Sequence, residues 1–337
     1  MVLLTGGTGF VGGHMLVHLI QAGRKVRALK RKNSSTRELE IICRFYGEDF
    51  QSISSHIEWI EGDLLNPESL DNALINVQEV YHCAAVVSFD GKDPEQLNRI
   101  NIEGTRNLVN ATIHTDISNF IYISSIGALG ESLSDKLITE ATSWNLQNQS
   151  SAYSNSKYHA EQEVWAGIEK SLNVIIVNPG IILGAGDFTK GSLRFFSQVK
   201  RGMPFYTDQQ TGYVDVRDVC KAILVLKEKQ LFNMRFILVS ENLTNKQLFT
   251  YIANALNKKP PFIRIGKTGL RIASMLNRLG CKISGKQPLL SREIVNSASG
   301  KHRYSSDKFL SNTGFSFTPM KKCIEDAVNG FNGNRND

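Results

Sequence analysis

The sequence predicts an α/β fold in which helices cover both faces of a doubly wound parallel sheet, followed by a smaller, mostly helical lobe. Short apolar runs alternate with segments of helical periodicity through the first half of the chain. A glycine-rich turn follows the first of these runs at once. The 337 residues, 41% of them hydrophobic, suffice for such a core and a second lobe, and they exclude a disordered, collagen-like or coiled-coil chain.

The order of the elements predicts how the chain is divided. We expect strands at residues 2–5, 26–30, 57–61, 80–84, 120–124 and 174–178, and helices at 10–21, 68–76, 98–112, 152–171 and 193–200. Residues 37–55 are a partly helical insert, and a helix at 216–228 and a strand at 235–239 return to the sheet. The prediction is a cofactor-binding domain at 1–178 joined by 213–240, a substrate lobe at 179–212 and 241–330, and a tail at 331–337.

Three glycines, Gly6, Gly9 and Gly12, follow the first strand at a spacing that is typical of dinucleotide-binding turns. Such a turn brings backbone N–H groups at a helix N-terminus close to a pyrophosphate. Phe10 and Val11 complete the turn. Because a strand precedes it and a helix follows it, the first domain is predicted to be of the Rossmann type and to hold a dinucleotide.

The end of the second strand indicates which dinucleotide is bound. Sites for NAD place an acid there to bind the ribose 2′-hydroxyl, whereas this chain has Lys30, Arg31 and Lys32 and no acid before Glu38. A guanidinium binds a 2′-phosphate with two parallel hydrogen bonds, so Arg31, with Lys32 adding charge, favours NADP(H). NAD(H) stays an alternative, since these residues can also be exposed charges at a strand end.

Two residues four positions apart, Tyr153 and Lys157, open a helical segment and share one face of it. The fifth strand ends at Ser124 and Ser125. A tyrosine, a lysine and a serine hydroxyl near a dinucleotide can exchange a proton with a substrate oxygen. A buried tyrosine and a solvated lysine are the alternative reading of the pair.

At this point several motifs in matching order show a resemblance. They are the glycine turn at 6–12, Gly-Asp-Leu at 62–64, His-Cys-Ala-Ala at 82–85, Asn-Ile-Glu-Gly-Thr at 101–105, the serine pair at 124–125, Tyr153 with Lys157, Asn-Pro-Gly at 178–180 and Tyr-Val-Asp-Val-Arg-Asp-Val at 213–219. With these motifs the chain resembles an extended short-chain dehydrogenase/reductase of the NAD-dependent epimerase/dehydratase superfamily.

The resemblance assigns a role to each matching residue. Asp63 and Leu64 would contact the adenine, Ala84 and Ala85 would lie under the pyrophosphate and nicotinamide ribose, Lys157 would hold the ribose hydroxyls, and Pro179 and Gly180 would pass the nicotinamide. Ser125, rather than Ser124, would be the catalytic hydroxyl, and Asn101 would hold a helix in place.

The proton chemistry follows from elementary considerations. A phenol with a pKa of about 10 is a poor base at neutral pH, so we expect the Lys157 ammonium and a positive nicotinamide to lower the pKa of Tyr153. Tyr153 then exchanges a proton with the substrate oxygen. Ser125 orients that oxygen while a hydride passes between the nicotinamide and the substrate carbon.

The sequence next to these motif residues indicates the branch of the superfamily. Dehydratases place an Asp-Glu pair after the catalytic hydroxyl, whereas Ile126 and Gly127 follow Ser125 here. Residues 26–31 and 153–165 are similar to the dihydroflavonol-reductase-like group, which includes relatives of 3β-hydroxysteroid dehydrogenases. The leading reading is an NAD(P)-dependent oxidoreductase that acts on a carbonyl or alcohol of a small, hydrophobic or aromatic substrate. A nucleotide-sugar epimerase with tightly bound NAD and a non-catalytic NADP(H)-binding regulatory protein are the alternatives.

The substrate pocket is expected between the carboxyl edge of the sheet and the second lobe. Its candidate lining is residues 86–89, Leu129, residues 181–183, Phe195, Phe196, Phe205 and Tyr206. The aromatic residues among them have an equally ordinary reading as core. No metal is expected, because His14, His18 and His82 have no nearby carboxylate cluster.

Composition limits the cellular compartments and binding partners that we expect for the protein. No run approaches the ~18 apolar residues of a membrane span, no secretory signal is recognised, and five scattered cysteines fit a reducing cytoplasm. The net charge of +7 is concentrated at 258–303, where eleven basic residues face one acid, Glu293. We expect a solvated helical face there, although peripheral membrane contact or an acidic substrate would also fit. No nucleic acid is expected, and the resemblance implies a homodimer.

Overall fold

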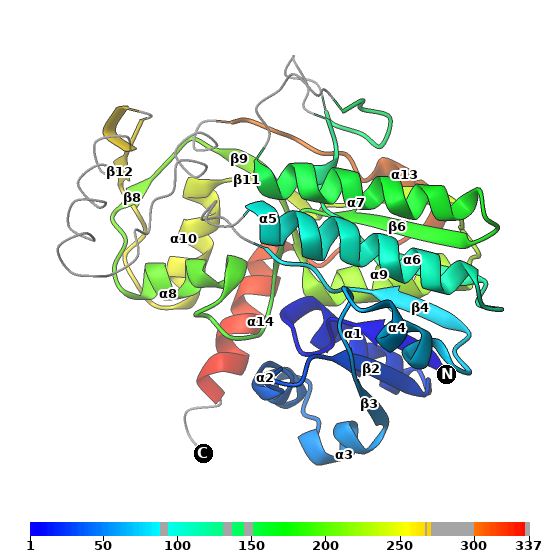
Figure 1. Cartoon of the computed structure of the whole chain (residues 1–337). Coiled ribbons are helices and arrows are strands. Elements are labelled where there is room, and N and C mark those ends of the chain that lie inside the picture. Colours follow the sequence, from blue (N-terminus) through cyan, green and yellow to red (C-terminus); the bar gives the residue numbers. More distant parts are fainter. Residues whose placement is uncertain (88–93, 131–136, 145–150, 267, 271–299, 334–337) are drawn as a thin grey trace.

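The computed structural model describes residues 1–87, 94–130, 137–144, 151–266, 268–270 and 300–333 (Figure 1). Its main feature is a seven-stranded sheet with the order β10-β6-β5-β4-β1-β2-β3, in which every neighbouring pair is parallel. The strands are β1 (Val2–Thr5), β2 (Val26–Lys30), β3 (Ile57–Glu61), β4 (Glu79–His82), β5 (Asn119–Ile123), β6 (Asn173–Pro179) and β10 (Met234–Leu238). The strand order reverses between β1 and β4, which is where open α/β sheets bind ligands.

Helices cover both faces of this sheet because successive strand residues point to opposite sides. On one face β-strand residues such as Leu4 and Ile175 pack with α1 (Phe10–Gln21), α2 (Arg37–Phe45), α3 (Phe50–Ser55) and α9 (Val216–Glu228). On the other face Leu3 and Ile176 pack with α4 (Pro67–Leu74), α6 (Gly104–Ile113) and α7 (Ala152–Ile168). The doubly wound α/β fold expected from the sequence is confirmed.

Two of the expected helices differ from their predicted bounds by more than two residues. The segment expected as one helix at 98–112 follows the short α5 (Pro94–Leu97), begins as the π-helical turn η1 (Asn98–Glu103) and continues as α6. The helix expected to reach residue 171 ends at Ile168, because Ser171 has a φ of +72° and its amide donates to the carbonyl of Ile168. A left-handed residue cannot continue a helix.

A second lobe follows β6. It contains a small sheet with the order β11-β9-β7, a two-stranded pair and several helices. These elements are β7 (Ile181–Leu183), η3 (Gly191–Leu193), α8 (Arg194–Lys200), β8 (Phe205–Tyr206), β9 (Gln210–Asp215), β11 (Glu241–Thr244), α10 (Asn245–Ala255), β12 (Ile263–Arg264), α13 (Asp307–Thr313) and α14 (Met320–Gly333). Residues of α8, α10 and α14 share one hydrophobic core there. Although β10 joins the large sheet, the expected domain bounds stay a prediction.

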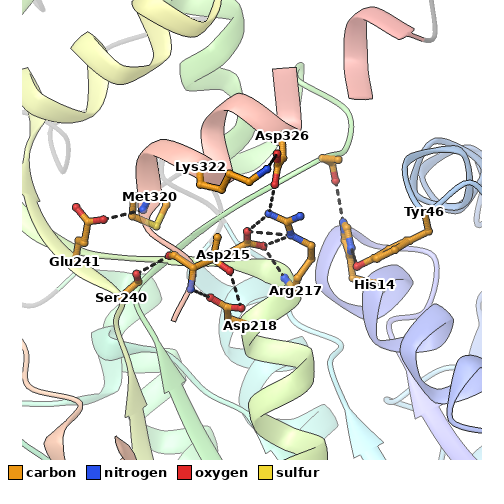
Figure 2. Close-up of polar contacts among 12 residues, drawn as sticks. His14, Tyr46, Asp215, Arg217, Asp218, Ser240, Glu241, Met320, Lys322 and Asp326 are labelled. Atoms are coloured by element: carbon orange, nitrogen blue, oxygen red, sulfur yellow. Dashed lines mark hydrogen bonds and ion pairs between the residues drawn. The ribbon is translucent and has the colours of Figure 1, made fainter. Parts of the chain in front are cut away.

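Charged and polar groups at 213–219 hold α14 against the main body (Figure 2). The guanidinium of Arg217 pairs with the fully buried Asp215 at 2.6 Å and with Asp326 of α14 at 2.9 Å. The carboxylate of Asp218 accepts from the backbone N–H of Thr318 at 2.6 Å. This motif, quoted above for the resemblance, therefore connects segments that are far apart in the chain.

Buried histidines make structural contacts. His14 is fully buried, with Nδ1 2.7 Å from the Tyr46 hydroxyl and Nε2 2.8 Å from the carbonyl oxygen of Ala185 (Figure 2). Burial lowers the pKa of His14 to about 4 and that of His82 to about 3, so both rings are neutral at pH 7. Among the described residues no group of three or more His, Cys, Asp or Glu side chains could hold a metal ion.

Two observations concern the expected relation of the protein to membranes and the expected role of its basic segment. Within the described ranges, no helix has both the length and the apolar character that crossing a bilayer requires. Most of the basic segment at 258–303, and Cys281 within it, lies outside the described residues.

Candidate functional site

A cavity of about 720 Å³ lies at the carboxyl ends of the strands of the large sheet. It has the size of a small-molecule or cofactor site. All residues expected to bind cofactor except Lys32 line it, namely Gly6, Gly9, Phe10, Val11, Gly12, Arg31, Asp63, Leu64, Ala84, Ala85, Tyr153, Lys157, Pro179 and Gly180. Lys32 is exposed and is not among the lining residues, so its expected contribution stays a prediction.

The backbone of the glycine turn lies so close to neighbouring backbone atoms that it leaves no room for side chains at Gly6 and Gly12. Gly6 has a φ of +76°, and a Cβ there would lie 2.7 Å from the amide nitrogen of Ala84. A Cβ on Gly12 would lie 2.1 Å from the carbonyl oxygen of Gly6. Side chains at these positions would displace the turn that carries the N-terminus of α1. The residues present therefore fit a bound pyrophosphate.

Positive and negative groups meet at the end of the cavity beside β2. Lys30, Arg31 and Ser34 line it, and the Lys30 ammonium lies 5.3 Å from the centre of the Trp59 ring. Glu38 also lines this end of the cavity and is buried. The sequence indicated it only as the first acid after the second strand. Its carboxylate accepts from the backbone N–H of Asp187 at 2.9 Å.

The other partner of Glu38 is a lysine from the second lobe. The ammonium of Lys190 lies 3.3 Å from the Glu38 carboxylate and also lines the cavity. This pair ties α2 to the loop before η3. Nothing in the sequence spacing could have indicated it, because the two residues are 152 positions apart.

The serine and tyrosine of the expected catalytic trio meet at the cavity. Ser125 closely follows β5 and its Oγ accepts from the backbone N–H of Gly127 at 3.0 Å. Tyr153 stands in the first turn of α7, which is capped by Ser151, whose Oγ accepts from the N–H of Ser154 at 3.0 Å. The hydroxyls of Ser125 and Tyr153 are hydrogen-bonded to each other. A substrate oxygen in the cavity can therefore face both groups.

The lysine of the trio faces the sheet. Lys157 is 1% exposed, and its Nζ donates to the Tyr122 hydroxyl at 2.9 Å and to the carbonyl oxygen of Ile123 at 2.8 Å. Burial lowers the pKa of Lys157 to about 7, and the carboxylate of Glu161 opposes this shift.

The pKa of Tyr153 moves in the direction opposite to the one expected. Burial raises it above its ordinary value, and only the hydrogen bond from Ser125 opposes the rise. The expected lowering by Lys157 is absent because Nζ is directed to Tyr122 and Ile123. At neutral pH the phenol is therefore protonated, which suits a proton donor.

Asn101 has the structural role that the resemblance implies. Its Nδ2 donates to the carbonyl of Val86 and to Oγ of Ser156, both at 3.0 Å, and its Oδ1 accepts from the N–H of Val86 at 2.8 Å. It does not line the cavity. The contacts attach the loop after β4 to α7.

The expected substrate pocket is corrected in part. Val86, Val87, Ile181 and Ile182 line the cavity, and they are joined by Gln96, Arg99, Ile100 and Leu193, which were not expected. Leu129, Leu183 and Phe196 are buried core side chains, Phe195 packs edge-on to Phe249, and Phe205 and Tyr206 belong to β8 away from the cavity. Ser88 and Phe89 lie outside the described residues. The aromatic residues at 195–196 are core because α8 packs on α10.

Comparisons with known proteins agree with this geometry. Residues 2–234 match the NAD dependent epimerase/dehydratase family. The chain is 28% identical to a Synechocystis sp. protein named "Putative dihydroflavonol 4-reductase", over 97% of this chain and 93% of that one. It is 23% identical to cinnamoyl-CoA reductase 1 of Petunia hybrida, over 97% of this chain and 91% of that one.

A solved structure extends the likeness over the whole chain. The crystal structure of gox2253 superposes with a TM-score of 0.81 at 29% identity, and covers 99% of this chain and 98% of that one. The family match spans well over half of the chain and includes the glycine turn, Ser125, Tyr153 and Lys157. The chain therefore belongs to the NAD dependent epimerase/dehydratase family, as an extended short-chain dehydrogenase/reductase.

Proposed function

We propose that this NAD(P)-dependent oxidoreductase reduces a carbonyl group of a small, hydrophobic or aromatic substrate with NADPH, and that Tyr153 donates the proton. The observation that supports it most is the meeting of Ser125, Tyr153 and Lys157 with the glycine turn in one cavity. The family accounts for the class of enzyme. The curated relatives that carry reductase names agree with the direction of reaction.

The cofactor would be held by groups already in place. Gly6, Gly9 and Gly12 would bind the pyrophosphate through their backbone, and Arg31 would bind a 2′-phosphate. Lys157 would hold the nicotinamide ribose. When bound, the nicotinamide supplies the hydride.

Proton transfer follows from the protonation states of the protein groups. Burial keeps the phenol of Tyr153 protonated at neutral pH, so its O–H can donate to a carbonyl oxygen that gains negative charge. Ser125 stabilises the same oxygen by a hydrogen bond. In the reverse reaction, the oxidation of an alcohol, the same phenol would have to act as a base in its ionised form.

Apolar side chains support a hydrophobic substrate. Val86, Val87, Ile100, Ile181 and Ile182 line the part of the cavity that the glycine turn leaves free. The names of the relatives, a dihydroflavonol reductase and a cinnamoyl-CoA reductase, point to aromatic carbonyl compounds. A pocket with many apolar and few polar groups selects such compounds by burial of their rings.

Fluorescence titration and a spectrophotometric assay test the proposal. NADPH and NADH are titrated into the wild type and Arg31→Ala, and oxidation of NADPH is followed with 4-nitrobenzaldehyde, benzil and phenylglyoxal as probes. We expect tighter binding of NADPH than NADH in the wild type only. Tyr153→Phe should lose turnover by about 10²- to 10⁴-fold while its affinity for NADPH changes less than about 3-fold. Retained turnover in Tyr153→Phe would contradict the assignment.

A nucleotide-sugar epimerase that uses NAD is the second candidate. It is favoured by Glu38, an acid at the same end of the cavity as Arg31, since a carboxylate there suits a ribose 2′-hydroxyl. Tighter binding of NADH than NADPH, or NAD retained on purification, would support it.

A further inference from the structure

A buried carboxylate behind the catalytic trio has no part in the proton chemistry above. Glu161 follows Lys157 by one turn of α7 and is 1% exposed. Its Oε2 accepts from the hydroxyl of Ser124 at 2.6 Å and from Nδ2 of Asn178 at 2.8 Å. Both donors stand at carboxyl ends of strands, Ser124 just beyond β5 and Asn178 within β6. Glu161 therefore joins α7 to the sheet at the edge where the cavity lies.

The contact with Asn178 continues to the catalytic serine. The same Nδ2 that donates to Glu161 also donates to the carbonyl oxygen of Ser125 at 3.0 Å. Asn178 is fully buried, so water cannot replace these bonds at low cost. The peptide that carries Ser125 is thus fixed from one side by Asn178, whose amide is in turn fixed by Glu161.

The second oxygen of Glu161 holds the carboxylate in place. Oε1 accepts from Nε1 of Trp165 at 3.2 Å and pairs with Nη1 of Arg235, from β10, at 3.1 Å. Arg235 also donates through Nε to the carbonyl of Glu140 at 3.1 Å. With four donors around one buried carboxylate, the side chain of Glu161 has few other arrangements open to it.

We propose that Glu161 is a positioning residue for carbonyl reduction: through Asn178 and Ser124 it holds the end of β5 so that the Ser125 hydroxyl meets that of Tyr153. The kinetic part of this inference rests on the proposed function. The geometric part does not, because the position of the Ser125 peptide can be measured without any substrate.

Glutamine is the informative replacement for Glu161, because it has the same shape but carries an NH₂ donor in place of one accepting oxygen. Trp165 and Arg235 can only donate, so the one accepting oxygen of the glutamine is expected to face them, and its NH₂ then replaces the oxygen that accepts from Asn178. Asn178 can meet this NH₂ by turning its Oδ1, a buried atom without a hydrogen-bond partner among the described residues, toward it, which breaks the bond from its Nδ2 to the carbonyl of Ser125. Glu163 supplies the matched control, since it lies on the same helix but pairs with Arg106 at the surface, at 2.7 Å.

Hydrogen–deuterium exchange of the intact protein measures the geometric part. The amides of Gly127 and Ala128 donate to Oγ and to the carbonyl oxygen of Ser125, each at 3.0 Å. We expect these two amides to exchange about 10-fold faster in Glu161→Gln and at the wild-type rate in Glu163→Gln. Ser124→Ala, which removes one donor and leaves the charge paired, serves as a milder second variant with about 3-fold faster exchange. Unchanged exchange in Glu161→Gln and Ser124→Ala overturns the proposal.

Kinetics with a carbonyl probe that the wild type reduces measure the functional part. We expect Glu161→Gln to lower kcat about 10- to 100-fold while KM for NADPH changes less than about 3-fold, and Glu163→Gln to change neither. In Glu161→Gln with Asn178→Ala, the losses in kcat should not add, because both remove the same support. Equal losses in both glutamine variants, or a loss confined to KM, overturn the proposal. If the wild type reduces none of the carbonyl probes, the proposed function is contradicted instead. Hydrogen–deuterium exchange at Gly127 and Ala128 then tests the positioning role of Glu161 by itself.

Discussion

The ammonium of Lys157 lies 2.9 Å from the hydroxyl of Tyr122 and 4.5 Å from the centre of the Tyr122 ring. Its charge is thus directed to β5 and to the cavity floor. The ammonium does not lower the pKa of Tyr153, one turn earlier on the same helix, and burial raises that pKa, so the phenol keeps its proton at neutral pH. The two residues of the Tyr–Lys pair therefore face different partners, which fits the separate tasks proposed for them: proton donation by the tyrosine and ribose binding by the lysine.

The first prediction concerns the pH dependence of turnover. Because burial lowers the pKa of Lys157 to about 7, its positive charge is complete well below that pH and is lost as the pH rises through it. We expect kcat/KM for NADPH to fall as pH increases from about 7 to 9. Tyr122→Phe, which removes one acceptor of the ammonium, should move this fall to lower pH. A profile that stays flat up to pH 9 in the wild type would count against the role of Lys157.

The second prediction concerns the glycine turn. A Cβ at position 12 would lie 2.1 Å from the carbonyl oxygen of Gly6, so Gly12→Ala must displace the turn that receives the pyrophosphate. We expect NADPH affinity to fall about 10- to 100-fold in a fluorescence titration. Gly266→Ala is the control, since a Cβ there meets no atom within 4 Å. Equal affinity in the two variants would mean that the turn does not hold the cofactor.

The third prediction concerns the attachment of α14. Arg217→Met leaves the fully buried Asp215 without its cation and removes the link to Asp326. We expect the free energy of unfolding to fall by about 3 kcal/mol in urea titrations. Lys321→Met, which removes an exposed pair with Glu325 at 4.0 Å, should change it by less than about 0.5 kcal/mol. A loss of similar size in both variants would show that Arg217 is an ordinary surface charge.

The fourth prediction concerns stability in acid. Burial lowers the pKa of His14 to about 4, so between about pH 6.5 and 4 the unfolded chain binds a proton that the folded chain does not. Stability is therefore lost as pH falls, by about 2 kcal/mol between pH 7 and 5 for this residue. His14→Gln should show a shallower dependence in urea titrations at these pH values, whereas His56→Gln, at an exposed position, should keep the wild-type dependence. An unchanged slope in His14→Gln would contradict this.

Local sequence patterns were sufficient for the parts of the site that lie within a single element or turn. Gly6, Gly9 and Gly12 stand in one turn, and Tyr153 and Lys157 share one helix face, so spacing alone places them. The arrangement of apolar residues also predicted α1 and α9 with the bounds observed.

Contacts between distant segments could not be predicted in this way. The partners of Glu161 come from three separate strand regions and its own helix, and no spacing rule relates them. The prediction that the aromatic residues between 195 and 206 line the substrate pocket was wrong for the same reason. Phe196 stacks on Phe188 at 4.3 Å and is fully buried, which depends on how the second lobe folds. The direction of the Tyr153 pKa shift likewise required the position of the Lys157 ammonium.

The attachment of α14 has a consequence for how the chain acquires its fold during synthesis. Arg217 and Asp326 are 109 residues apart, so a growing chain that has completed β9 and α9 still lacks one of the two acids that neutralise the guanidinium. The ribosome must add roughly a third of the chain before this link can close. Until then the side chains of α8 and α10 that pack on α14 stay without this cover, and the nascent protein exposes apolar surface of that core.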